Sequence, residues 1–74
     1  MQIVSPTHKK FGERLKELRG KHNLTQEDLA DKVGVDRSYM GFLERGEKNP
    51  TLRNLIRIAK SFDISLSELF KGIS

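Results

Sequence analysis

Cysteine and tryptophan are absent from this sequence, and proline occurs only twice in its 74 residues. Without cysteine, neither disulfide bonds nor thiolate zinc ligands can support a small fold. Apolar runs never exceed two residues, far fewer than a membrane-spanning helix needs, and residues 1–6 lack the apolar segment of a signal peptide. We therefore expect a cytoplasmic protein that is held together by hydrophobic packing.

The chain has room for one domain, and its charges are unevenly distributed. A chain of this size buries only about 60% of its unfolded surface, so we expect a small core. Lys and Arg number 14 against 10 Asp and Glu, which gives a net charge of +4. An ordinary soluble surface explains a slight basic excess, but the whole excess lies in residues 1–22, and such clustering favours attraction to nucleic-acid phosphates. The charged residues of this segment are Lys9, Lys10, Arg14, Lys16, Arg19 and Lys21, against Glu13 and Glu17.

Apolar residues recur at helical spacing and no strand pattern occurs, so the sequence predicts an all-α fold of five short helices. Residues 1–6 have no such pattern and are interpreted as a flexible arm in front of one domain over residues 7–74. The first helix is expected to begin at Pro6 or Thr7, because proline is tolerated in a first turn. It should end around residues 20–23.

Two short helices joined by a tight turn come next. Thr25 stands three residues before Asp28, the spacing of a capping box, so a helix is predicted over residues 26–33. Gly34 permits the left-handed backbone that a sharp turn needs. Asp36 can cap the following helix, which a second glycine ends.

The last two helices are indicated by their first residues. Pro50 forces an extended link, because its ring disfavours helical geometry in the residue before it. Thr51 then caps a fourth helix with the most apolar face in the chain. Ser65 and Glu68 form a second capping-box pattern, and the fifth helix should continue to Gly72. The apolar face of the fourth helix consists of Leu55, Ile56, Ile58, Ala59 and Phe62.

The third helix begins with side chains that a core does not need. In a helix-turn-helix the second helix of the pair enters the major groove of DNA. Arg37 can bond guanine O6 and N7 together, Ser38 can contact a base edge or a phosphate, and Phe42 can meet a thymine methyl. Tyr39 and Phe42 fit an alternative equally well, as core residues at helical spacing.

Four segments in fixed order resemble the Xre/Cro family of phage-repressor-type helix-turn-helix domains. They are residues 25–30 (TQEDLA), 34–39 (GVDRSY), 43–46 (LERG) and 49–52 (NPTL), within a match that extends from about Phe11 to Phe70. The resemblance implies a compact five-helix, lambda-repressor-like domain that regulates transcription by binding double-stranded DNA. Within the family, the short chain is most similar to the controller proteins of restriction–modification systems, although antitoxins and stand-alone phage regulators share the domain.

The resemblance also implies roles for individual residues. Gln26 would bond a DNA phosphate at the start of its helix. Glu47 departs from the basic residue often found at its position, which puts the strength of the backbone grip in doubt. The implied base contacts are Asp36, Arg37, Ser38, Tyr39 and Phe42, and the remaining phosphate contacts are Arg45, Lys48 and Asn49.

A supporting ion pair is implied between the first and third helices. Arg19 and Glu44 match a family pair of this kind, and Glu44 stands next to Leu43 on the apolar side of its helix. Two unrelated surface charges are the alternative. If the pair is partly buried, the loss of one partner would strand a charge at a cost of a few kcal/mol.

Two other classes of function are alternatives to DNA binding. The sequence does not favour catalysis, because His8 and His22 stand apart as solvated helix residues and Ser38 has no adjacent base or glycine elbow. The stronger rival is an antitoxin or another protein-interaction module, because the C-terminal apolar residues exceed the needs of a small core. The family favours using them for a homodimer on a palindromic operator, with no cofactor, metal or small-molecule ligand. These candidate interface residues are Ile64, Leu66, Leu69, Phe70 and Ile73.

Overall fold

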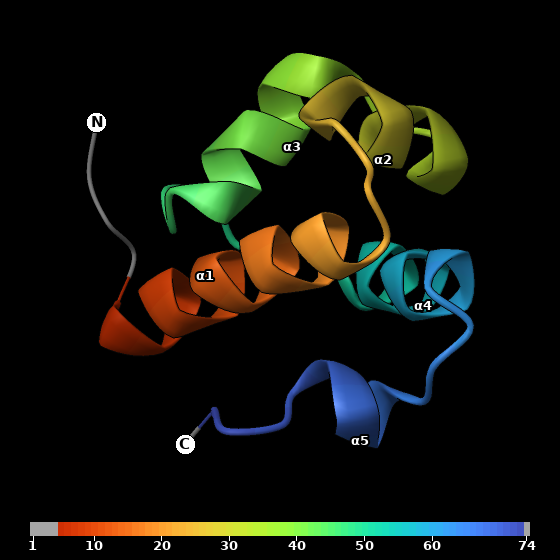
Figure 1. The fold of residues 1–74 in the computed structure, drawn as a ribbon. Helices are drawn as coiled ribbons and strands as arrows, with labels where there is room; N and C mark the ends of the chain where they lie inside the picture. The colour runs from red at the N-terminus through yellow and green to blue at the C-terminus, as the bar shows by residue number, and fades with distance from the viewer. Residues whose placement is uncertain (1–4, 74) are drawn as a thin grey trace.

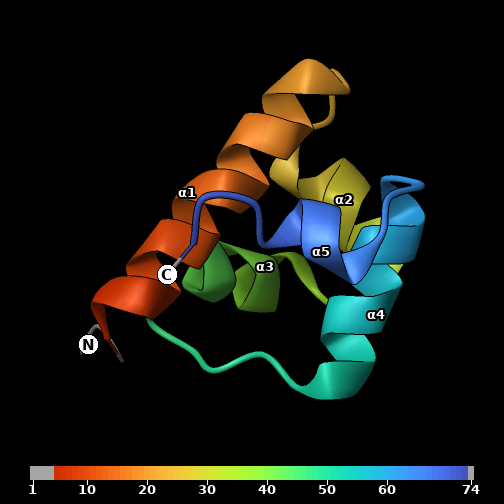
Figure 2. The same ribbon diagram turned by 90° about the horizontal axis from the view of Figure 1, so that it is seen from below.

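The computed structural model describes residues 5–73, and every regular element in that range is a helix. The elements are α1 (Pro6–Lys21), α2 (Gln26–Val33), α3 (Arg37–Glu44), α4 (Leu52–Ser61) and α5 (Leu66–Leu69). In Figure 1, α1 runs through the middle of the molecule, with α3 above it and α5 below. Figure 2 shows the segment between α3 and α4 as a long extended connection along one side. The predicted five-helix, all-α fold is confirmed.

Each helix begins at a side-chain cap that the sequence placed correctly, except the first. Thr25, Asp36, Thr51 and Ser65 each accept a bond from the backbone N–H three residues later. In α1 the cap is Ser5, whose hydroxyl accepts from the His8 N–H. Ser5 and Pro6 thus belong to the helix rather than to an arm, and residues 1–4 lie outside the described range. Such caps satisfy backbone donors that the first helical turn leaves open.

The capping box of α2 is complete. The Thr25 hydroxyl accepts from the Asp28 N–H, and the Asp28 carboxylate accepts from the Thr25 N–H, both at 3.0 Å. The bond from the Thr25 backbone lowers the pKa of the Asp28 carboxyl below its usual value. The short Asp side chain therefore serves as well as the more usual Glu.

The core draws on every helix of the fold. Leu15, Leu29, Met40, Ile58 and Leu69 come from five different helices and are completely buried. Two predictions about the C-terminal half are wrong in detail. Ile56 lies on the outside of α4, and α5 ends at Leu69 instead of Gly72. Buried residues beside these five are Phe11, Leu18, Ala30, Val33, Leu43, Ala59 and Phe62.

Candidate nucleic-acid interface

Five of the predicted contact residues line one shallow polar hollow of about 220 Å³. It lies between the start of α2 and the outer side of α3. Gly41 forms part of its lining, and a Cβ at that position would lie 3.1 Å from the Arg45 guanidinium. The fold therefore brings together residues that are up to nineteen positions apart in the sequence. The five are Gln26, Arg37, Ser38, Phe42 and Arg45.

The turn before α3 presents Arg37 and Ser38 to solvent. Gly34 ends α2 with a φ of +86°, and the chain reverses there into the short link to α3. The Asp36 carboxylate accepts from the Tyr39 N–H at 2.7 Å, so it is engaged in capping α3. Arg37 and Ser38, in the first turn, are both exposed. Arg37 and Ser38 line the hollow, and Asp36 does not.

A buried carboxylate ties the two helices of the pair to α1. Glu44 is only 1% exposed, and the Arg19 guanidinium donates to both of its oxygens, at 2.6 and 3.1 Å. The carboxylate holds the pKa of Arg19 above its ordinary value. The predicted Arg19–Glu44 pair is therefore present. Such a pair is expensive to break from one side, because the remaining charge stays buried.

The same carboxylate also holds Gln26. The Gln26 side-chain Nε2 donates to Glu44 Oε1 at 3.0 Å, which fixes the amide at the edge of the hollow. One N–H of that amino group remains for another acceptor. Gln26 is also the first residue of α2, where unpaired backbone N–H groups favour an anion.

Cations gather around the Phe42 ring on the adjoining loop. The Arg45 guanidinium lies 5.1 Å from the ring centroid and the Lys48 ammonium 5.3 Å from it. Arg45 also donates from Nε to the Glu47 carboxylate at 3.0 Å. Phe42 is half-buried and lines the hollow, and its ring makes cation–π contacts with both side chains. Glu47 neutralises part of the positive charge that they supply.

Tyr39 lies on a different side of α3 from the hollow. Its ring packs against the core, and its hydroxyl accepts from the Asn54 side chain at 3.1 Å. Both interactions are made within the domain, so Tyr39 acts in this structure as a packing residue, which was the alternative to a DNA contact. The sequence did not identify Asn54 as its partner.

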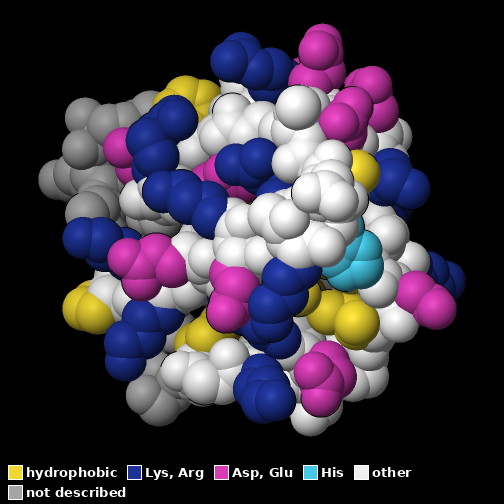
Figure 3. Space-filling view, in the orientation of Figure 1, with side chains coloured by type: hydrophobic (Ala, Val, Ile, Leu, Met, Phe, Trp, Pro, Cys, Tyr) yellow, Lys and Arg dark blue, Asp and Glu magenta, His cyan; other side chains and the backbone are white. Residues whose placement is uncertain are grey.

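Two of the six basic side chains of α1 are engaged in contacts within the domain. Arg19 is paired with Glu44, and Arg14 donates to Glu17 and to the backbone carbonyls of Glu68 and Leu69. On the face seen in Figure 3, Lys and Arg side chains alternate with Asp and Glu and form no continuous basic patch. The exposed cations of α1 are therefore its four lysines, Lys9, Lys10, Lys16 and Lys21.

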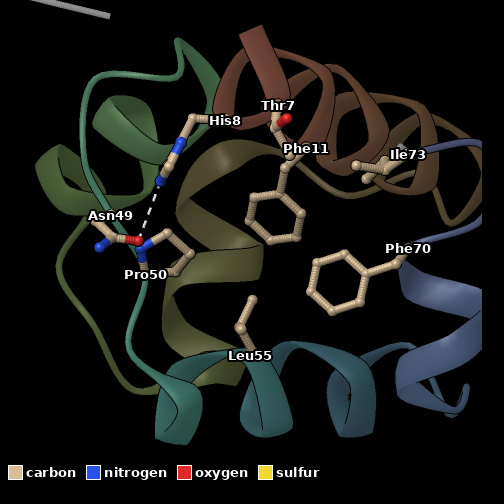
Figure 4. Close-up of a pocket in the computed structure, with 8 residues that line it drawn as sticks. All are labelled: Thr7, His8, Phe11, Asn49, Pro50, Leu55, Phe70 and Ile73. Atoms are coloured by element: carbon tan, nitrogen blue, oxygen red, sulfur yellow. Dashed lines mark hydrogen bonds between the residues drawn. The ribbon is translucent and has the colours of Figure 1, made fainter. Parts of the chain in front are cut away.

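The residues predicted for a dimer interface differ in burial and form three groups. Leu69 is completely buried in the core, so its side chain is unavailable to a partner. Phe70 and Ile73 face Phe11 and Leu55 across a pocket of about 180 Å³ (Figure 4), and Ile64 is half-buried. Of the five, only Leu66 is exposed, at 36%. Sequence reasoning missed Leu52 at 66% and Ile56 at 38%, the other large hydrophobic residues exposed within residues 5–73.

The prediction that His8 is a solvated helix residue is wrong, because both of its ring nitrogens have partners within the domain. Its ring Nε2 lies 3.1 Å from the Asn49 side-chain oxygen (Figure 4). Its Nδ1 lies 2.6 Å from the Ser5 hydroxyl. Asn49, expected to grip the DNA backbone, therefore has a partner 41 positions earlier in the chain. No local pattern reveals such a contact, because it depends on how the loop after α3 crosses α1.

The described part of the chain also bears on metal binding and membrane insertion. Within residues 5–73, no group of three or more His, Asp or Glu side chains is arranged to hold a metal ion. No helix in the same range is long and apolar enough to cross a membrane.

Known proteins share both the sequence pattern and the fold around the hollow. The helix-turn-helix family model HTH_3 matches residues 15–69. An uncharacterised HTH-type transcriptional regulator of Archaeoglobus fulgidus is 47% identical over 57 residues, which cover 77% of this chain and 81% of the relative.

Two solved structures are similar in both sequence and fold. The restriction–modification controller protein C.AhdI from Aeromonas hydrophila is 49% identical with a TM-score of 0.82, covering 85% of this chain and 96% of its own. The P22 c2 repressor, solved in complex with a synthetic operator, is 34% identical with a TM-score of 0.76, covering 84% of this chain and 94% of its own.

Proposed function

This chain belongs to the HTH_3 helix-turn-helix family of DNA-binding transcription regulators, and on that premise we propose that it binds a palindromic operator as a homodimer. The observation that carries the proposal is the hollow between α2 and α3, which collects Gln26, Arg37, Ser38, Phe42 and Arg45 on one surface. By contrast, the pocket that Phe11 and Phe70 line contains no residue of α2 or α3.

Base reading is assigned to the first turn of α3. Arg37 and Ser38 are exposed, and their side chains make no hydrogen bond or ion pair within residues 5–73, so a base edge would meet free donors. A bidentate Arg–guanine contact contributes about 1–3 kcal/mol of discrimination against the wrong base. Asp36 can be a flanking contact only if its carboxylate accepts from the Tyr39 N–H and from a base donor at the same time.

Phosphate contacts flank this turn on both sides. Gln26 lies at the start of α2, and Arg45, Lys48 and Asn49 follow α3. These groups would set the register of α3 in the groove without reading the sequence themselves. Their number fixes how steeply affinity falls with salt.

The homodimer is supported by apolar surface that the monomer leaves exposed. Leu52 and Ile56 lie one turn apart on α4, and Leu66 begins α5, which packs against α4. A two-fold dimer that presents its recognition helices about 34 Å apart would match half-sites one DNA turn apart. A role as the controller of a restriction–modification system is the narrower proposal, supported by the likeness to C.AhdI.

One selection experiment tests the proposal. The protein is incubated with a pool of random DNA duplexes, and the bound sequences are recovered over several rounds. Enrichment of a two-fold symmetric sequence, with a dimer on that DNA by sedimentation velocity, is the expected result. An absence of enrichment would refute sequence-specific binding and favour the protein-interaction alternative, and a monomer with and without DNA would refute the dimer.

A further inference from the structure

The first turn of α1 and the loop after α3 are joined by a chain of polar contacts. Ser5 Oγ and His8 Nδ1 are 2.6 Å apart, and His8 Nε2 and Asn49 Oδ1 are 3.1 Å apart (Figure 4). The Ser5 hydroxyl also accepts from the His8 backbone N–H, so the ring is attached to the cap of its own helix. His8 therefore connects a rigid helix start to an exposed loop residue.

The acceptor on Asn49 determines how the protons are placed. An amide oxygen can only accept, so His8 Nε2 must carry a proton and donate it. In a neutral ring Nδ1 is then the acceptor, and the Ser5 hydroxyl donates to it. This arrangement satisfies both ring nitrogens and leaves the Asn49 amino group with two N–H donors for another acceptor.

The backbone of the loop presses on the same turn of α1. Gly46 has a φ of +73°, and a Cβ there would come within 2.8 Å of the Lys9 Cα. The loop is thus fixed at Gly46 by close approach and at Asn49 by His8. Lys48, between these two points, lies over the Phe42 ring. Two fixed points three residues apart leave the loop little freedom.

We infer that His8 is a positioning residue for DNA binding: it holds the Asn49 amide with its oxygen toward α1 and its amino group free to donate to a DNA phosphate. This inference rests on the proposed function and assigns no DNA contact to His8 itself. An unheld Asn49 would have to order its side chain and choose between two amide orientations on binding, which costs entropy.

A double-mutant cycle on the selected operator tests this role. The variants are His8→Phe, Asn49→Ala and the combination of both. His8→Phe keeps an aromatic side chain but removes its N–H donor. We expect each single variant to bind DNA about ten-fold more weakly, since a hydrogen bond to a charged group is lost or loosened. The double variant should bind no more weakly than Asn49→Ala alone. His8→Gln, which supplies an N–H at similar reach, should recover most of the affinity.

Lys48→Ala is the matched control for a direct phosphate contact. It should reduce the salt slope by about one, whereas His8→Phe should leave the slope unchanged. A His8→Phe loss that persists in the Asn49→Ala background would overturn the inference, since His8 would then act on DNA directly. Wild-type protein that binds no duplex at all would refute the proposed function and the inference together.

Nitrogen NMR of the free protein gives a readout that needs no DNA. The His8 ring should be the Nε2–H tautomer in the wild type and should lose that preference in Asn49→Ala. An Nδ1–H tautomer in the wild type would overturn the inference even if the protein binds its operator tightly.

Discussion

Arg37 is the residue whose loss should change which sequence the protein prefers. It is exposed in the first turn of α3, beside the hollow. We expect Arg37→Ala to cost about 1–3 kcal/mol on the selected operator and to relax the preference at one base position. Binding titrations on the operator and on single-base variants measure both effects.

Lys48→Ala gives the contrast for Arg37. Its loss should weaken all sequences alike, because a phosphate contact carries no base information. Equal affinity of Arg37→Ala and the wild type for the operator would contradict the assignment of Arg37 to base reading.

Glu47 should limit the affinity of the chain for any duplex. Its carboxylate accepts from Arg45 Nε, and the Arg45–Glu47 pair lies beside the cations on Phe42. Glu47→Gln should release Arg45 and strengthen binding by an amount on the order of 1 kcal/mol, the upper range for an exposed pair. A steeper salt dependence should accompany the gain, because one more phosphate is neutralised.

Glu13→Gln is the matched control for this change. It removes the same charge from an exposed position on α1, so it should leave the slope of the salt dependence as it is. If Glu47→Gln binds no more tightly than Glu13→Gln, the Arg45–Glu47 pair does not limit the affinity for DNA.

At the residue scale, the sequence predicted which side chains of α3 are exposed better than it predicted contacts between distant residues. Arg37 and Ser38 were predicted from their place in a helix start, which local spacing determines. The bonds from Gln26 to Glu44 and from His8 to Asn49 connect residues 18 and 41 positions apart. They depend on crossing geometry, which no local pattern specifies.

Helix α1 approaches α3 so closely that one position tolerates only glycine. A Cβ on Gly12 would lie 2.3 Å from the Glu44 carbonyl oxygen, and that atom belongs to the backbone. Gly12→Ala must therefore push the helices apart, and we expect it to destabilise the fold by about 1–3 kcal/mol, as overpacking does. Urea unfolding followed by circular dichroism measures the change.

Gly20 supplies the internal comparison for Gly12. It lies in the same helix, and a Cβ at this position would have no neighbouring atom of the described residues within 4 Å. Gly20→Ala should stabilise the protein by about 0.4–1 kcal/mol through the unfolded chain and helix propensity. Equal effects of the two substitutions would show that the close approach of α1 and α3 is absent in solution.

The ion pair between α1 and α3 should couple those helices energetically. Arg19→Ala leaves the buried Glu44 carboxylate without its partner, so we expect it to cost about 3–5 kcal/mol. Glu44→Gln should cost less, because the Arg19 side chain that it leaves is 21% exposed. Their combined cost should be smaller than the sum, and a double-mutant cycle in unfolding free energy measures the difference. A cycle at the Arg14–Glu17 pair, whose carboxylate is 54% exposed, should give much weaker coupling. Additive costs at Arg19 and Glu44 would contradict the role of the pair.

At the element scale, side-chain caps made the helix starts predictable. Thr25, Asp36, Thr51 and Ser65 act locally, through bonds to the third residue onward, so the sequence is enough to place them. The end of α5 was predicted too late because apolar spacing continues past Leu69. There Phe70 and Ile73 pack in a turn against Phe11 and Leu55.

At the scale of the whole molecule, residues 5–73 include three large apolar side chains that are exposed in the monomer, and we propose that a dimer covers them. Leu52, Ile56 and Leu66 lie on two helices that pack together, away from the polar hollow that binds DNA in our proposal. The sequence pointed to the C-terminal apolar residues as a group. It did not separate Leu69, which completes the core, from Leu66, because both fit the spacing of one short helix.

A charge placed on this apolar surface should separate assembly from folding. Leu52→Glu or Leu66→Glu adds a carboxylate that a dimer interface would have to desolvate, so each should shift the protein toward monomer in sedimentation velocity. Because these side chains contribute little to the monomer core, the thermal midpoint of dilute protein should change little. Binding to the full palindrome should fall far more than binding to a half-site, since the linked second site is lost.

The matched control is Ser67→Glu, which adds the same charge at an exposed neighbouring position and should still dimerise. Dimers of unchanged affinity in both Leu52→Glu and Leu66→Glu would move the interface to another face of the molecule.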